Sequence, residues 1–129
     1  MKSTILKECV RIAKEKNKFK HIKEPFRHFS FIIQRNTIIE WGTNRRSGSP
    51  PIFFGYPLHS MIHSELDAYN KARGLLEHNK DFEIVNIRLN KRGKLRLSKP
   101  CEYCYAFMKA KGASCVWFST DIDFAKILL

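Results

Sequence analysis

Two short clusters of polar residues carry the side chains best suited to chemistry. His63 and Glu65 stand two residues apart, and Cys101 and Cys104 stand three apart later in the chain. Cysteines at that spacing lie on one face of a first helical turn, where free N–H groups and the helix dipole favour thiolates. Pro100 suits the start of such a helix, because its missing N–H donor costs little there. The clusters together predict a metal site beside a carboxylate.

The side-chain types in these clusters are typical of catalytic zinc. Two thiolates and one imidazole make three protein ligands, and a catalytic zinc keeps its fourth position for water. The pKa of that water is lowered to ~7, which supplies hydroxide at neutral pH. Glu65 lies two residues beyond His63, so it can sit near the metal without binding it and transfer protons.

A structural zinc site is the main alternative for these residues. His59 stands four residues before His63 and would supply a fourth ligand. This alternative leaves Glu65 without a role. A redox pair of the thioredoxin type is a further alternative, but here the cysteine pair comes late in the chain. Cys9 and Cys115 stand alone, and we interpret both as buried, inert thiols.

The composition indicates a single domain over residues 1–129. A chain of 129 residues has the usual size of one domain with one core. No stretch approaches the ~20 apolar residues of a membrane span, and the N-terminal stretch lacks the apolar run and cleavage site of a secretory signal. We therefore expect a cytoplasmic protein with no membrane partner, in which disulfides are disfavoured.

The chain is strongly basic, with 24 Lys and Arg against 12 acidic residues and a formal charge of +12. Such an excess favours a polyanionic partner. Residues 1–28 are rich in cations and form either a solvated face or part of a contact surface. Residues 88–99 contain no acidic residue and lead directly into the cysteine pair, so we interpret them as a phosphate contact. Their cations are Arg88, Lys91, Arg92, Lys94, Arg96 and Lys99.

Hydrophobic periodicity predicts alternating helices and strands, which indicates an α/β sheet with helices on its faces. Ser3 or Thr4 can cap the first helix, and Gly42 closes the first hairpin. Gly112 ends the last helix. The expected elements are a helix over 2–16, strands over 29–34 and 37–41, a helix over 60–78, a strand over 82–89, a short extension over 95–97, a helix over 101–111, a strand over 115–119 and a short tail.

Residues 43–58 are rich in Gly, Ser and Pro and are expected to form a loop long enough to suspect function. Its aromatic residues are expected to pack the loop down, with stacking on a base as the alternative; they are Phe53, Phe54 and Tyr56. In the following helix, Leu75 and Leu76 are expected to face the core. The remaining histidines are interpreted as surface or core residues: His21, His28, His59 and His78.

The ordered pair His-x-Glu and Pro-Cys-x-x-Cys resembles the signature of the cytidine and deoxycytidylate deaminase superfamily. The resemblance covers about residues 29–120, and the run GKLRLSKPCEYC followed by VWFST looks most like small deaminases encoded by phages, large viruses and some microbes. It implies a three-layer α/β/α fold with a central mixed sheet of four to five strands, and Zn2+ held between two helix N-termini.

The resemblance also implies roles for individual residues. His63, Cys101 and Cys104 would hold the metal, and Glu65 would be the catalytic proton carrier. Asn44 matches the Asn of a Gly-x-Asn segment that touches the nucleotide sugar and base in many relatives. The expected substrate contacts are Asn44, Ser64, Ser98 and Pro100.

The chain departs from the superfamily pattern in three places. Ser64 replaces the commoner Ala, and Lys99 stands where many relatives carry Glu or Ser. The tail after Ser119 is short, so the fifth strand or the last helix of larger relatives is expected to be abbreviated or missing. Relatives are often dimers or larger, so a homo-oligomer is a further expectation.

The predicted function is therefore zinc-dependent hydrolytic deamination of cytosine to uracil in a nucleotide or in single-stranded nucleic acid. A deaminase of the free-nucleotide pool, acting on dCMP or cytidine, is an alternative that differs only in substrate size. Adenine and guanine remain alternative bases, because base choice lies in the shape of the pocket. A zinc-containing nucleic-acid binder without activity is the alternative that is not an enzyme.

Overall fold

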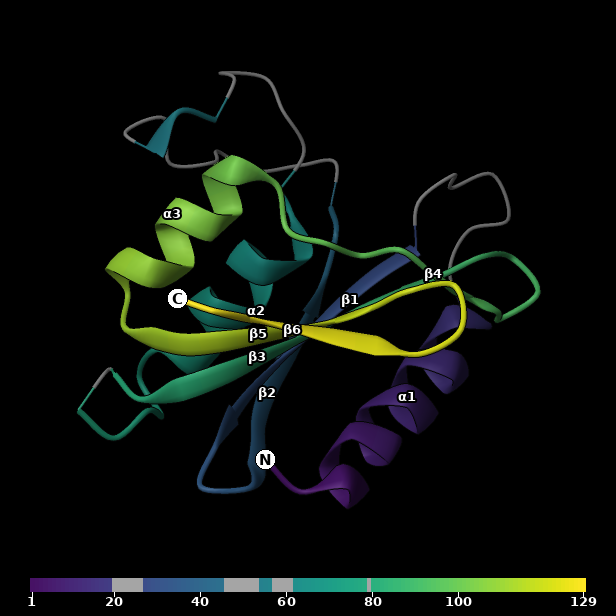
Figure 1. The fold of residues 1–129 in the computed structure, drawn as a ribbon, viewed down its shortest axis with the longest axis horizontal. Helices are drawn as coiled ribbons and strands as arrows, with labels where there is room; N and C mark the ends of the chain where they lie inside the picture. The colour runs from purple at the N-terminus through teal and green to yellow at the C-terminus, as the bar shows by residue number, and fades with distance from the viewer. Residues whose placement is uncertain (20–26, 46–53, 57–61, 79) are drawn as a thin grey trace.

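The computed structural model describes residues 1–19, 27–45, 54–56, 62–78 and 80–129, and these ranges form a mixed sheet with helices on both faces (Figure 1). The elements are α1 (Ser3–Asn17), β1 (Arg27–Gln34), β2 (Thr37–Thr43), α2 (Ser64–Ala72), β3 (Phe82–Leu89), β4 (Leu95–Arg96), α3 (Glu102–Ala110), β5 (Ala113–Ser119) and β6 (Phe124–Leu128).

The main path of the sheet runs in the order β2-β1-β3-β5-β6, and β4 pairs with the end of β3. Only β3 and β5 are parallel, because α3 carries the chain back between them, whereas the other neighbours are antiparallel. The expected mixed α/β sheet is confirmed. The strand count differs from the expected four to five: in the described residues the sheet has six strands, since the two-residue β4 joins it.

The tail after Ser119 forms the edge strand β6, which is five residues long. Thr120 Oγ1 accepts a hydrogen bond from Asp123 N at 2.9 Å, and this turn reverses the chain directly onto β5. The register runs from Ser119 opposite Phe124 to Cys115 opposite Leu128. The tail follows this path because pairing satisfies backbone groups that β5 would otherwise expose at the sheet edge.

Helices cover both faces of the sheet, which confirms the three-layer arrangement (Figure 1). Successive side chains of a strand point to opposite faces. Phe29 and Phe31 of β1 therefore pack in the cluster that contains Cys9 and Ala13 of α1, whereas Ile32 packs in the cluster of α2 and α3. The central strands are buried on both faces, which explains why apolar residues stand at neighbouring positions in them rather than in strict alternation with polar ones.

The predicted hairpin between β1 and β2 is confirmed, but Gly42 does not close it. Arg35 and Asn36 form the turn with φ of 53° and 56°, as a two-residue hairpin turn with two left-handed residues requires. Gly42 lies inside β2, which continues to Thr43. Its hydrogen lets α2 approach the strand, because a Cβ there would lie 2.3 Å from the backbone nitrogen of Ala68.

We expect Gly42→Ala to lower the free energy of unfolding by about 1–3 kcal/mol, the usual cost of overpacking, because the neighbouring atoms are helix backbone that cannot rotate away. Urea unfolding followed by circular dichroism measures the change. Gly74→Ala is the matched control, since a Cβ at Gly74 meets nothing within 4 Å. Equal losses in the two variants would contradict this explanation.

The helix boundaries correct two predictions. The N-cap of α1 is Lys2 without a side-chain cap, so neither Ser3 nor Thr4 caps it. The helix predicted over 60–78 is shorter, since Ile62 pairs with Arg45 as an isolated bridge and α2 spans only Ser64–Ala72.

The segment after α2 leaves the helical path, so the side chains there do not keep helical spacing. Leu76 is buried as expected, but Leu75 is 62% exposed. At the end of α3, Gly112 has a φ of 99°, which confirms its predicted role as the stop of that helix.

Candidate active site

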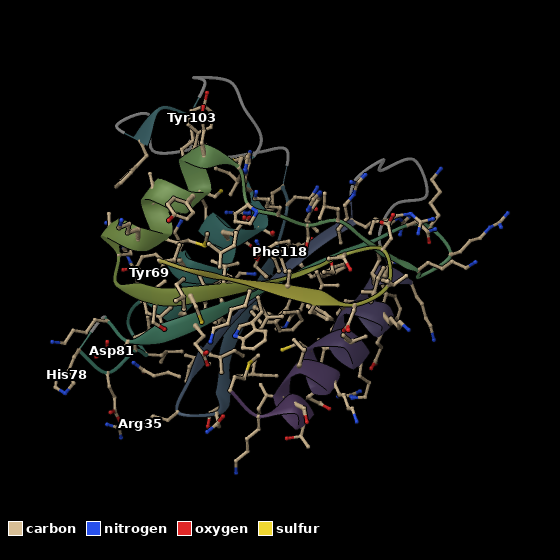
Figure 2. All side chains as sticks on the ribbon, in the orientation of Figure 1. Arg35, Tyr69, His78, Asp81, Tyr103 and Phe118 are labelled. Atoms are coloured by element: carbon tan, nitrogen blue, oxygen red, sulfur yellow. The ribbon has the colours of Figure 1, made fainter. Side chains whose placement is uncertain are left out.

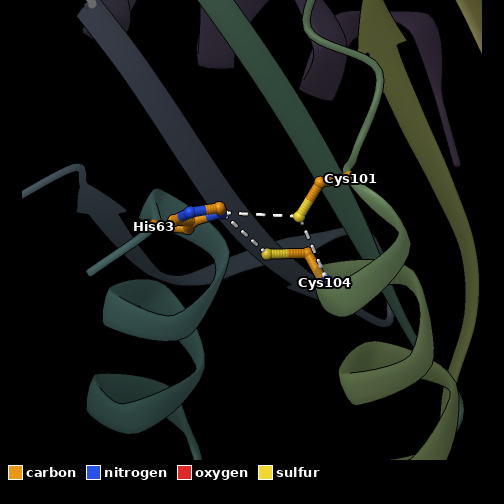
Figure 3. Close-up of side chains that lie close together, drawn as sticks. All are labelled: His63, Cys101 and Cys104. Carbon is orange, nitrogen blue, oxygen red and sulfur yellow. Dashed lines mark hydrogen bonds between the residues drawn. The ribbon is translucent and has the colours of Figure 1, made fainter. Parts of the chain in front are cut away.

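The N-termini of α2 and α3 bring together the two sequence clusters (Figure 3). His63 is the N-cap residue of α2, and Cys101 is the N-cap residue of α3; both have extended backbone. His63 Nδ1 lies 3.6 Å from Cys101 Sγ and 3.3 Å from Cys104 Sγ. The Cys101 sulfur also accepts a hydrogen bond from Cys104 N at 3.4 Å, as expected of sulfur beside a helix N-terminus.

These three side chains are a donor set that can hold a metal. Their ligand atoms all lie within 4.8 Å of one another. A nitrogen and a sulfur bound to one tetrahedral zinc lie about 3.6 Å apart, given the usual bond lengths, so the observed spacing fits zinc. Within the described residues, no fourth His, Cys, Asp or Glu joins the cluster. His59, the fourth ligand of the structural-zinc alternative, lies outside those residues.

The cluster strongly perturbs the acidity of its own groups. Hydrogen bonding by the Cys104 thiol, and then by His63, lowers the pKa of Cys101 to about 4. The same bond to Cys101, together with burial, raises the pKa of Cys104. The hydrogen bond to Cys101 also raises the pKa of His63. The lowered pKa of Cys101 and the raised pKa of His63 thus favour a thiolate beside a protonated imidazole. A bound cation would take the place of the imidazole proton.

In metal-free protein at pH 7, we expect iodoacetamide to modify Cys101 before the isolated thiols. Burial raises the pKa of Cys9 to about 12 and that of Cys115 to about 11, whereas the pKa of Cys101 is about 4. Only the thiolate is the nucleophile. Peptide mass spectrometry measures the order of labelling, and added zinc should protect Cys101. Labelling of Cys9 or Cys115 first would show that the acidity of the site is misassigned.

Glu65 is the second residue of α2 and lies beside this cluster. Its side chain is only 7% exposed, and burial raises the pKa of the carboxyl above its ordinary value. Asn86 Nδ2 donates to Glu65 Oε2 at 3.0 Å, and Ser64 Oγ donates to Oε1 at 3.2 Å. A carboxyl group that is held by two donors and whose pKa is raised is suited to the role of a proton carrier.

Two residues that the sequence analysis did not identify hold Glu65 in place. Asn86 on β3 is 3% exposed and Ser30 on β1 is fully buried. Ser30 Oγ donates to Asn86 Oδ1 at 2.7 Å and lies 2.7 Å from Ser64 Oγ, so the four side chains form one buried polar cluster. The available signal was a polar residue between apolar neighbours in each strand, within FSFII of β1 and IVNI of β3, since buried polar groups need partners.

Glu65 and two of the three cluster residues, His63 and Cys101, line one cavity of about 370 Å³. Of the expected substrate contacts, Asn44, Ser64 and Ser98 line it, whereas Pro100 is not among its lining residues. The Ser98 hydroxyl is engaged within the protein, donating to Asn86 O at 2.8 Å. The lining residues are His28, Asn44, His63, Ser64, Glu65, Ser98, Lys99 and Cys101.

The cavity and its surroundings include residues interpreted differently from sequence. His28 lines the cavity, although it was expected to be an ordinary surface or core residue. Tyr56 Oη donates to Cys104 Sγ at 2.7 Å, and its ring stands edge-on to the His63 ring. Phe54 packs edge-on against Phe107 of α3. These two loop aromatics therefore pack the loop down as predicted, while Phe53 lies outside the described residues.

No protein-family model and no curated protein matches this chain. Among solved structures, it is similar to the dCMP deaminase of the cyanophage S-TIM5 in its apo form, with a TM-score of 0.60 and 17% identity over 92% of this chain and 84% of that one. The complex of that enzyme with dCMP and dUMP matches with a TM-score of 0.59 and 17% identity, over 92% and 82% of the two chains. The chain has the cytidine and deoxycytidylate deaminase fold.

Proposed function

We propose that this chain is a zinc-dependent hydrolytic deaminase that converts cytosine to uracil in a nucleotide or in single-stranded nucleic acid. His63, Cys101 and Cys104 are the proposed zinc ligands, and Glu65 is the proposed catalytic residue. One observation carries the proposal: three donor atoms lie within 4.8 Å of one another, and two of their residues, His63 and Cys101, line the same cavity as the buried carboxyl group of Glu65. The fold supports it, since the similar solved structures are deaminases.

The proposed reaction adds water at the ring carbon that bears the amino group and releases the amine as ammonia. Zinc held by one imidazole and two thiolates would supply a water with its pKa lowered to ~7. Glu65 would take one proton from the attacking water and give it to the ring nitrogen, then take the second proton from the new hydroxyl group and give it to the amine, which leaves as ammonia. Asn86 and Ser64 keep the carboxyl oriented through these transfers. Asn44 and His28 line the same cavity and are the proposed contacts to the rest of the nucleotide.

Cytosine is the proposed base because a structural neighbour was solved with dCMP and dUMP, a cytosine nucleotide and its deaminated counterpart. Adenine and guanine are the alternative bases. Among the described residues, no helix combines the length and apolar character needed to cross a membrane.

A substrate panel assayed for ammonia tests the proposal. We expect the zinc-loaded protein to release ammonia from at least one cytosine substrate among dCMP, cytidine and single-stranded DNA or RNA, and to leave adenosine unchanged. Release from adenosine alone would overturn the choice of base. Tight binding of a nucleic acid without ammonia release from any substrate would instead favour a binding protein that uses zinc for folding.

A further inference from the structure

Residues 90–96, the turn between β3 and β4 together with β4, are here called the basic hairpin. A cationic surface begins at this hairpin. Lys91, Arg92 and Lys94 are exposed, and Arg96 is half-buried. Together with Asn90 they line a shallow depression. In the described part of the chain, Lys91, Arg92 and Lys94 form no ion pair. Their mutual repulsion is thus uncompensated within these residues, which favours an anionic partner.

The basic hairpin leads directly into the candidate active site. Arg96 belongs to the depression on the hairpin, and Lys99 lines the catalytic cavity. Only two residues lie between them, so three steps of extended chain separate their Cα atoms by at most about 11 Å. Leu97, on this path, is 52% exposed. The path is held in place by Ser98, whose hydroxyl lies 2.8 Å from that of Ser119 and accepts from Ser119 N at 2.8 Å.

The other side of the basic hairpin adjoins the C-terminal end of α1. Asn17 Nδ2 donates to Asn90 O at 3.0 Å, which ties the helix end to the turn. Lys14 and Lys18 are exposed there, and Phe19 is 80% exposed. These three residues line a second depression, together with Arg11 and Glu15, which pair with each other.

Cations and exposed apolar side chains thus follow one another from the cavity, across the basic hairpin, to the end of α1. Figure 2 shows nitrogen-tipped side chains extending outward from this β4 end of the molecule. A positively charged track with an aromatic platform is how proteins bind single-stranded nucleic acid: phosphates follow the cations, and bases stack on the rings. A mononucleotide seated in the cavity has too few phosphates to reach this track.

We propose that the substrate is a cytosine within a single-stranded polynucleotide, whose phosphates follow Lys99, Arg96, Arg92 and Lys91 away from the cavity. In this arrangement a neighbouring base packs against Leu97, and a more distant base stacks on Phe19. The inference rests on the proposed deaminase function and names its substrate class. The recognised chemistry is the phosphate chain with unpaired bases, which DNA and RNA share, and the experiment uses both.

Binding of fluorescently labelled single-stranded oligonucleotides, DNA and RNA of the same sequence, is measured by anisotropy over a series of salt concentrations. The logarithm of the binding constant falls with slope of about −0.7 per phosphate contacted. We therefore expect a slope of about −3 for four contacts. Ammonia release from the same oligonucleotides and from dCMP is measured in parallel, with a kcat/KM for one oligonucleotide about tenfold or more above that for dCMP.

The double variant Lys91→Gln/Arg92→Gln should weaken oligonucleotide binding about tenfold or more and make the salt slope shallower by about 1.4. The matched control is Lys80→Gln/Lys109→Gln, which removes the same charge at the opposite end of β3. Lys80 lies between His78 and Asp81, labelled away from β4 in Figure 2, and Lys109 is in the last turn of α3. The control should bind oligonucleotides as the unaltered protein does.

Phe19→Ala should weaken oligonucleotide binding about fivefold or more, the usual effect of losing one stacked base. Leu75→Ala is the control, since Leu75 is also an exposed apolar residue. Neither Phe19 nor Leu75 is packed in the core, so folding is preserved, and circular dichroism checks this.

Three outcomes separate the two proposals. Salt-dependent binding that the hairpin variant weakens, with ammonia released from oligonucleotides, supports the inference. Ammonia release from dCMP, with oligonucleotide binding that is weak or equally affected by the control variant, overturns the inference and leaves the deaminase function standing. Oligonucleotide binding with both predicted variant effects, but no ammonia from any cytosine substrate, overturns the deaminase function and the substrate assignment with it.

Discussion

Glu65→Gln should reduce kcat for cytosine deamination by about 10²–10⁴-fold, the usual contribution of a positioned proton carrier, while the amount of bound zinc stays the same. The glutamine side chain keeps the size of the carboxyl group but cannot accept or release a proton at neutral pH. Asn86 and Ser64, which donate to the two carboxyl oxygens, would still find one amide oxygen to contact. Folding should therefore be little affected, and the loss should appear in kcat rather than KM.

Steady-state ammonia release and the zinc content of the purified variant are the two measurements for Glu65→Gln. Glu102→Gln is the matched control, because Glu102 is also in the first turn of a helix beside the site but is exposed. It should keep activity within about twofold, the range expected of an exposed surface substitution. Full activity of Glu65→Gln with zinc still bound would show that another group carries the protons.

Cys101→Ser should weaken zinc binding by more than about 100-fold and abolish measurable deamination. A serine hydroxyl stays protonated at neutral pH, whereas the pKa of the Cys101 thiol is lowered to about 4, so that a thiolate is available to the metal. Loss of one of three ligands should cost more than loss of a supporting group, which typically costs 10–100-fold. Competition with a chromophoric chelator measures the affinity.

A thermal readout separates loss of metal from loss of folding in Cys101→Ser. Zinc binds only the folded chain, so a chelator should lower the Tm of the unaltered protein but leave that of Cys101→Ser unchanged. Cys115→Ser is the control, because Cys115 is buried but donates to Glu83 Oε1, a bond that serine can keep. Unchanged zinc affinity in Cys101→Ser would remove this residue from the proposed site.

Local sequence features predicted the elements whose formation depends on neighbours along the chain. The two-residue turn at Arg35 and Asn36 needs only residues that tolerate left-handed backbone, and the hairpin is confirmed. The stop of α3 at Gly112 has the same kind of cause. The spacing of Cys101 and Cys104 likewise places both sulfurs at one helix start, since three residues complete almost one turn.

Contacts between distant segments could not be read from the sequence in the same way. Gly42 looked like a hairpin terminator, but its real neighbour is the backbone of Ala68 in another element. Ser30 and Asn86 looked like ordinary strand residues, yet they are opposite each other in the register of β1 and β3. Ser30 donates a hydrogen bond to Asn86, and Asn86 donates one to Glu65. The tail had no assigned structure from sequence, and the open edge of β5 gives it a partner as a strand.

Covalent spacing and backbone geometry are enough to place the reactive groups locally: an imidazole two residues before a carboxylate, and two thiols one helical turn apart. The folded chain adds the long-range contacts: His63 Nδ1 lies 3.3 Å from a sulfur 41 residues away, and Asn86, which Ser30 contacts, orients Glu65. These contacts depend on how the strands pair and how the helices pack on the sheet, which no local spacing specifies.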